Sequence, residues 1–179
     1  YRMSYSSSSS SSSKRITEKV DEICRTIRSN DDAWSIRLNQ LISLQQLIKT
    51  TKREKEGWTN DCLQRLHKTL STQIQDLRSS IVRETCKVIQ LFSTCLKDGF
   101  RSLGKTLLPV LLDVVGCGNK VISGYANETC ACLIEHVHIK STLSLLSELI
   151  RTSRNKILRE RSMSYFHIIL DTWSDQDVQ

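Results

Sequence analysis

Apolar side chains recur along this chain at the three- and four-residue spacing of amphipathic helices, from Ile16 to Leu170. In the first segment, for example, Ile16, Val20 and Ile23 share one helical face. The same pattern predicts eight helices, centred on residues 16–27, 38–48, 62–74, 82–96, 103–115, 121–134, 143–150 and 157–170. The hydrophobic pattern therefore predicts an all-α protein.

Short polar stretches separate these helices and carry residues that begin or end them. Asn30-Asp31-Asp32 is a capping cluster ahead of the second helix, and Gly116 to Asn119 is a turn with two glycines. Pro109 lies inside the fifth helix and is expected to kink or split it. The other breaks fall at residues 50–57, 76–80, 98–99 and 152–155.

The helices fall into pairs that repeat along the chain. The second helix of each pair begins near Trp34, Ser79, Asn119 and Asn155, in steps of 45, 40 and 36 residues. Pairs recurring at about 40 residues are typical of HEAT or armadillo arrays, because one pair cannot bury its apolar face alone. The predicted fold is therefore an α-solenoid of about four HEAT-type helix pairs.

An unbroken serine run, Ser6 to Ser13, precedes the first helix. It has no apolar side chain to bury and cannot offset the entropy of ordering. We therefore expect a serine-rich flexible linker over residues 1–14 and one domain of HEAT-type repeats over residues 15–179. Because the chain begins at Tyr1 rather than Met, we also expect it to be a fragment of a larger protein.

The composition supports a helical protein of a reducing compartment. One proline and six glycines are too few for the many tight turns of an all-β protein. The seven cysteines are odd in number and mostly occupy apolar helical positions, which indicates free thiols rather than disulfides. No apolar run approaches the roughly 20 residues of a membrane span, and no signal-peptide-like stretch opens the chain. We expect a cytoplasmic protein without membrane insertion.

One segment imitates a nucleotide-binding loop. Gly99 to Thr106 match G-x-x-x-x-G-K-[ST], in which backbone amides cradle phosphates. That loop needs a preceding strand, whereas the preceding segment here has a helical pattern. Asp113, which imitates a magnesium-binding aspartate, falls inside the helix that the loop would require. Since no serine lies in a G-x-S-x-G elbow either, we predict that the chain is not an enzyme and needs no cofactor.

A second segment imitates a zinc site, with Cys130, Cys132, His136 and His138 close together. On one helix, Cys130 and Cys132 point about 200° apart and cannot face the same metal. Cys132 and His136 share a face, but zinc needs three or four ligands. We expect core thiols and no metal.

Basic residues cluster at or just after the turns that open each second helix. The net charge of +7 predicts an acidic partner. In a solenoid these turns share one edge, so the array would present a ridge of positive charge. The alternative is a solvated basic face without a partner. The basic residues concerned are Arg37, Arg78, Arg83, Lys120, Arg154, Lys156 and Arg159.

Trp34 belongs to the first of these turns and has two possible roles. Exposed beside Arg37, it would be typical of a binding hot spot; otherwise it packs back onto the first helix. A basic ridge could also bind nucleic acid. The chain has no aromatic series for base stacking, so we expect a protein partner instead.

Several segments resemble the TOG-type domains of the CLASP family. Asp76 to Cys86 resembles the turn and helix of their second repeat, and Asn119 to Gly124 the turn of their third. Glu135 to Ile139 and Arg159 to Phe166 resemble parts of the fourth repeat, and Asp32 to Leu41 the first turn with its tryptophan. The resemblance extends from about residue 16 to residue 173 and depends on the order and spacing of these segments.

The resemblance implies a tubulin-binding module that stabilises microtubules, promoting rescue and suppressing catastrophe at growing ends, spindles and kinetochores. A full TOG domain has about six repeats, of which this chain would hold four. Implied partners are tubulin, microtubules, and end-binding and kinetochore proteins. The implied tubulin-binding residues are Trp34, Arg37, Ser79, Ser80, Arg83, Lys120, Asn155 and Lys156. The alternative function is a HEAT-repeat scaffold for protein–protein interaction without tubulin binding.

Overall fold

A computed structural model describes residues 6–52 and 55–174, and these contain eight α-helices and no strand. Two short 3-10 turns lie in connections between helices: η1 (Lys55–Gly57) after the second α-helix and η2 (Lys97–Phe100) after the fourth. None of the described helices is long and apolar enough to cross a membrane. The helices are α1 (Ser6–Ser29), α2 (Trp34–Thr50), α3 (Asn60–Ile74), α4 (Ser79–Leu96), α5 (Arg101–Val115), α6 (Lys120–His136), α7 (Ser141–Thr152) and α8 (Lys156–Thr172).

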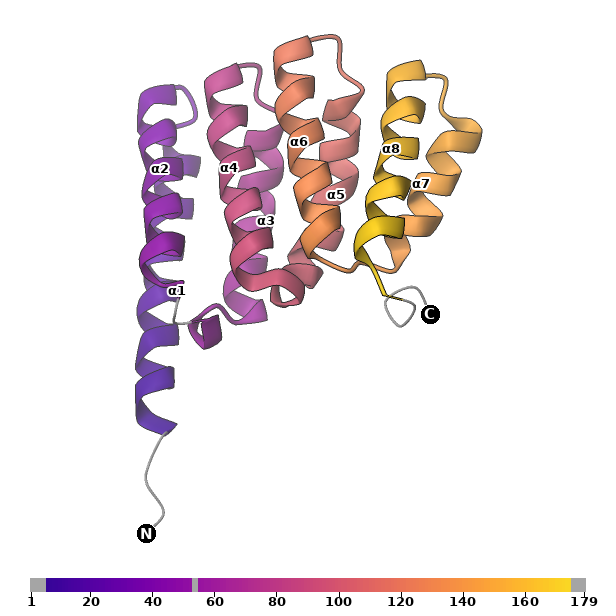
Figure 1. Cartoon of the computed structure of the whole chain (residues 1–179). Helices are drawn as coiled ribbons and strands as arrows, with labels where there is room; N and C mark the ends of the chain where they lie inside the picture. The colour runs from indigo at the N-terminus through magenta and orange to yellow at the C-terminus, as the bar shows by residue number, and fades with distance from the viewer. Residues whose placement is uncertain (1–5, 53–54, 175–179) are drawn as a thin grey trace.

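The helices form four antiparallel pairs that stack side by side in chain order (Figure 1). Helices α2, α4, α6 and α8 pack in one layer, α1, α3 and α5 in a second, and α7 packs on α8. The second helices begin at Trp34, Ser79, Lys120 and Lys156. The predicted all-α, HEAT-like array is confirmed, and the repeat period read from the sequence places each second helix within one residue.

A continuous apolar core runs through the stack and contains an aromatic cluster near the connections between pairs. The ring centroids of Trp58 and Phe92 lie 4.9 Å apart edge to face, and those of Phe92 and Phe100 lie 5.2 Å apart. Trp58 donates its indole N–H to Thr51 Oγ1 at 3.0 Å, so this buried polar group is satisfied. The cluster joins α4 to two connections: the one between α2 and α3, which contains Trp58, and η2, which contains Phe100.

Polar bonds between neighbouring pairs fix the register of the stack. Gln90 donates to Thr129 Oγ1 at 3.0 Å, and the hydroxyl of Tyr165 donates to Asn127 Oδ1 at 2.9 Å. The indole N–H of Trp173 donates to the carbonyl of Ile134 at 2.8 Å. Each of these bonds spans 38 or 39 residues, which is close to the length of one repeat.

In the structure α1 begins at Ser6 and includes the serine run, for which the composition predicts a linker. Serine costs only a few tenths of a kcal/mol per residue relative to alanine in a helix, and the helix is nucleated by the packed segment that follows. Gly57 of η1 approaches this helix closely, since a Cβ there would lie 2.6 Å from Ile16 Cδ1. Residues 1–5 of the expected linker lie outside the described residues.

Pro109 does not split its helix, since α5 runs unbroken from Arg101 to Val115. The proline is exposed. The carbonyl that loses its amide partner lies one turn back on the same face, and water can satisfy it there.

Candidate functional site

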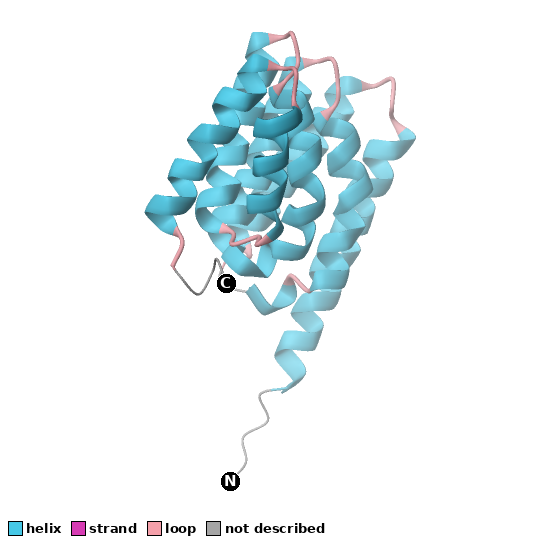
Figure 2. Ribbon diagram, turned by 90° about the vertical axis from the view of Figure 1, so that its right-hand side faces the viewer, coloured by secondary structure: helices cyan, strands magenta, loops and turns pink. Residues whose placement is uncertain are grey.

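The four turns inside the helix pairs lie in a row along one edge of the stack (Figures 1 and 2). We call this row the turn edge; it consists of residues 30–33, 75–78, 116–119 and 153–155 and the first residues of the helices that follow. The connections between pairs lie at the opposite edge. The common edge follows from the repeat, because every second helix begins there.

Each turn exposes at least one large apolar side chain, and the first turn also exposes Ile36, which is 39% exposed. Trp34 is 46% exposed, Leu77 92%, Val121 54% and Ile157 50%. Trp34 thus presents nearly half of its surface to solvent and does not pack fully back onto the first helix. Val121 and Ile157 were missed because the apolar pattern assigns them to the core, and Leu77 was missed because it lies in a break between helices. Val121 and Ile157 each precede a buried neighbour, so an apolar pair beside an N-cap is the signal that could have identified them.

Exposed cations lie beside these apolar side chains at the second, third and fourth turns. Arg78 follows Leu77, Lys120 precedes Val121, and Lys156 precedes Ile157. Arg154 is exposed in the fourth turn as well. The first turn instead exposes Asp31 and Asp32. The positive charge therefore gathers on the last three turns, and the tryptophan stands at the acidic end of the row.

Arg37 is not part of the exposed charge, contrary to the expectation from the sequence. Its side chain is 3% exposed, and its Nη1 donates to Gln73 Oε1 and Asp76 Oδ2, both at 2.7 Å. Burial would raise the pKa of Asp76, but the Arg78 amide and the Arg37 guanidinium outweigh it and lower that pKa. Arg37 thus binds the first pair of helices to the second turn.

Asn155 and Arg159 also hold the turns in place. Asn155 Oδ1 accepts from the Leu158 amide at 3.2 Å and caps α8, and its Nδ2 donates to the Gly116 carbonyl at 2.8 Å. This second bond joins the third turn to the fourth. Arg159 is half-buried and donates to the Ser153 carbonyl at 2.7 Å. These two residues fix the positions of their exposed neighbours.

The remaining residues predicted for the site lie on α4. Ser79 is exposed and Ser80 half-buried in its first turn. Arg83 is exposed one turn further along, and its Nε donates to Glu84 Oε1 at 2.9 Å. Glu84 also accepts from Lys87 at 2.9 Å and from Gln45 at 2.8 Å. Arg83 therefore presents a charge that is partly neutralised.

The backbone adds positive potential to the turn edge. Helices α2, α4, α6 and α8 all point their N-termini at it, and none of these described helices has an acidic residue in its first turn. A helix N-terminus carries about half a positive charge. The adjoining C-termini of the first helices offset part of this potential, so the exposed side chains set its pattern.

A groove of about 290 Å³ separates the second and third turns. Ile74 and Leu77 line one side, and Val114, Cys117 and Ile122 line the other. Its lining is mainly apolar, so it can receive an apolar side chain of a partner.

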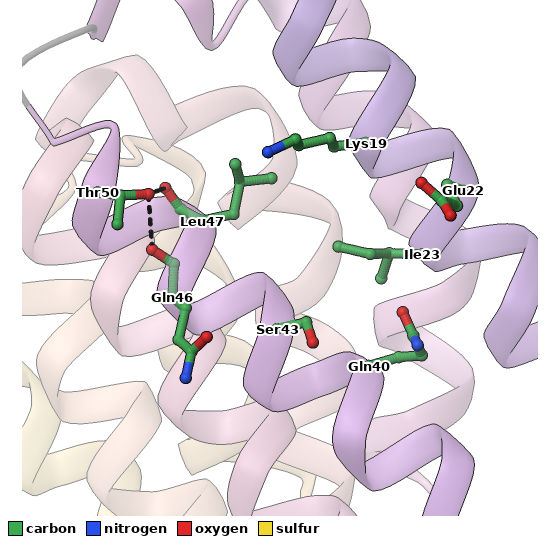
Figure 3. A pocket seen from close by; sticks show the side chains of 8 residues that line it. All are labelled: Lys19, Glu22, Ile23, Gln40, Ser43, Gln46, Leu47 and Thr50. Carbon is green, nitrogen blue, oxygen red and sulfur yellow. Dashed lines mark hydrogen bonds between the residues drawn. The ribbon is translucent and has the colours of Figure 1, made fainter.

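A second hollow, of about 370 Å³, lies between α1 and α2 at the outer end of the stack (Figure 3). Lys19, Glu22 and Ile23 line it from α1, and Leu47 and four polar side chains line it from α2. Thr50 Oγ1 there donates to the carbonyls of Gln46 and Leu47 at 2.9 and 3.1 Å.

The segment that imitates a nucleotide-binding loop is helical. Residues 101–106 belong to α5, where backbone amides serve the helix rather than a phosphate. A Cβ on Gly104 would lie 3.1 Å from Leu133 Cδ1, so this glycine allows α5 and α6 to pack closely.

The cysteine–histidine cluster on α6 does not converge on a metal. Cys130 is fully buried, whereas the Cys132 thiol lies 4.0 Å from the Gln90 carbonyl and 3.9 Å from His136 Nδ1. Burial raises the pKa of Cys132 to about 11, which keeps it a thiol. Nowhere in the described part of the chain do three His, Cys, Asp or Glu side chains meet as metal ligands would.

The comparisons with known proteins agree with this architecture. Residues 16–179 match the family model described as CLASP N terminal. The chain belongs to the CLASP N-terminal family. Over 164 residues, covering 92% of this chain, it is 29% identical to an uncharacterized protein of Dictyostelium discoideum and 27% identical to the CLIP-associated protein of Arabidopsis thaliana. Over 168 residues, covering 94% of this chain, it is 21% identical to CLIP-associating protein 1-B of Xenopus laevis.

The chain corresponds to a small part of these CLASP relatives. It spans 20% of the length of the Dictyostelium protein and 11% of the length of the Arabidopsis and Xenopus proteins. The match covers all four helix pairs and the whole turn edge.

Proposed function

We propose that the turn edge binds tubulin and that the chain is a non-catalytic module of a microtubule-stabilising protein. The observation that carries this proposal is the row of four exposed apolar side chains, Trp34, Leu77, Val121 and Ile157. Buried aromatic and aliphatic anchors with nearby cations supply most of the binding energy in protein interfaces. Tubulin is acidic, so the exposed cations of the last three turns have the complementary sign.

Membership of the CLASP family supports tubulin as the partner rather than another acidic protein. The proposed role is the family's general one: rescue of shrinking microtubules and suppression of catastrophe, on cytoplasmic and spindle microtubules. Trp34, Ser79, Ser80, Arg83, Lys120 and Lys156 would contact tubulin, together with Leu77, Val121 and Ile157. Arg37 and Asn155 would act indirectly, by holding the turns in place.

Gel filtration with purified tubulin dimer tests the proposal. We expect the chain to co-elute with tubulin at low salt, and the double variant Trp34→Ala, Lys120→Ala to elute separately. Lys140→Ala is the matched control, because Lys140 is an exposed lysine in the connection between α6 and α7, at the opposite edge. Separate elution of the wild-type chain, or co-elution of the double variant, would count against tubulin binding and favour a scaffold for another partner.

A further inference from the structure

A groove of about 460 Å³ runs between α6 and α8 and begins at the turn edge. Lys120 and Ile157, at its mouth, belong to the third and fourth turns, so the groove continues the proposed tubulin-binding surface down the layer of second helices. Its lining contains no aromatic ring. The eight lining residues are Lys120, Ser123, Gly124, Asn127, Ile157, Glu160, Arg161 and Ser164.

The groove has open space beside Gly124, which is one of its lining residues. A glycine inside a helix is less stable than alanine by roughly 0.5–1 kcal/mol, and it often marks a close approach of two segments. Gly104 has a packing reason, because its Cβ would press on Leu133. A Cβ on Gly124 would meet no atom within 4 Å. The space beside Gly124 is therefore open to a ligand rather than filled by the protein.

Three side chains of the groove, Lys120, Asn127 and Arg161, offer donors to a ligand, whereas the hydroxyls of Ser123 and Ser164 donate to backbone carbonyls. Lys120 and Arg161 form no ion pair with any other residue that the structure describes. The one carboxylate in the lining, Glu160, lies 3.6 Å from the ammonium of Lys156, which partly neutralises it. Asn127 Oδ1 accepts from the buried Tyr165 hydroxyl, and this bond orients the side-chain amide and leaves its N–H groups for a ligand.

We propose that the α6–α8 groove receives an acidic side chain of the protein bound on the turn edge. Its carboxylate would lie between the Lys120 ammonium and the Arg161 guanidinium and accept from the Asn127 amide. The exposed Ile157 would contact the apolar stem of the same segment. This inference rests on the proposed function, since it assigns the acidic segment to tubulin. Nucleic acid fits less well, because the lining offers no ring on which a base could stack.

Fluorescence anisotropy of a labelled decaglutamate peptide tests the groove directly. Gly124→Met fills the open space without changing charge, and Gly124→Ala is its control because it removes the same glycine and leaves the groove open. We expect Gly124→Met and Arg161→Glu each to weaken peptide binding by about tenfold, whereas Gly124→Ala and the distant Lys140→Glu keep the wild-type affinity. Equal affinities for Gly124→Met and Gly124→Ala would overturn the proposal.

Two further measurements test whether a loss of peptide binding comes from destabilisation of the fold and whether the groove binds nucleic acid instead. Thermal unfolding should show Gly124→Met to be at least as stable as the wild type, because it removes a helical glycine. A mixed-sequence oligonucleotide that binds as well as the peptide, with the same loss in Gly124→Met, would overturn the assignment to a protein segment.

Binding assays with tubulin distinguish a failure of the groove assignment from a failure of the proposed function. If Trp34→Ala weakens tubulin binding and Gly124→Met does not, the groove assignment fails and the turn edge stands. If wild-type chain binds the peptide in a Gly124-dependent way but does not bind tubulin, the assignment of the acidic segment to tubulin fails together with the proposed function.

Discussion

Arg37 and Asp76 form an ion pair of 2.7 Å that joins the first helix pair to the second turn. Both side chains are largely buried, at 3% and 10% exposed. Removal of one partner from such a pair leaves an uncompensated buried charge, which costs about 3–5 kcal/mol. The position of Leu77, next in the chain to Asp76, depends on this pair.

We therefore expect Asp76→Ala to destabilise the fold by about 3 kcal/mol. Arg37→Ala should have a similar effect, and the double variant should lose less than the sum because the two residues interact. Urea unfolding followed by circular dichroism measures all three. Additive losses would show that the pair is not coupled.

Acid should weaken the fold through two carboxylates with lowered pKa values. Burial opposes ionisation of Asp76 and Glu84, but the surrounding donors and cations outweigh it in both. Their stabilising contribution is present above their ordinary pKa values of 3.8 and 4.5, and is lost as pH falls through the lowered folded values. Asp76→Asn should therefore lose less stability than the wild type between about pH 5 and about pH 3, as judged from thermal melts at each pH.

The aromatic cluster should dominate core stability. Phe92 contacts both Trp58 and Phe100, so Phe92→Ala should lower the free energy of unfolding by about 3–5 kcal/mol. Phe92→Leu keeps most of the buried volume and should cost less. Equal losses for the two variants would contradict a packing origin for the effect.

Cys117 should react first among the thiols of the described chain. It is half-exposed in the third turn, whereas burial raises the pKa of Cys86 and of Cys132 to about 11. The thiolate is the reactive form, so these two should react slowly at pH 8. Ellman's reagent should show one fast thiol that disappears in Cys117→Ser. Because Cys117 lines the groove between the second and third turns, bound tubulin should slow this reaction.

The helices and their pairing could be predicted from the sequence because each depends on local spacing and on a period that the chain repeats. The role of Arg37 could not, because its partner Asp76 lies 39 residues away in the next pair. Charge alone suggested an exposed residue there. The exposure of Val121 and Ile157 depends on which member of an apolar pair faces the core, and only the packed stack decides this.

The contact between α1 and η1 could not be predicted from the sequence either. In the structure Gly57 lies close to Ile16. The two segments are about 40 residues apart, and the local composition of neither one indicates that they meet.

The dissociation constant of Leu77→Ser for tubulin measures whether the row of exposed side chains on the turn edge binds tubulin. Leu170→Ser is the matched control, since Leu170 is 77% exposed and lies about 20 Å along α8 from the turn edge. We expect Leu77→Ser to weaken tubulin binding by about tenfold or more and Leu170→Ser to bind nearly as well as the wild type. Equal affinities of the two variants would contradict binding through the row of exposed side chains on the turn edge.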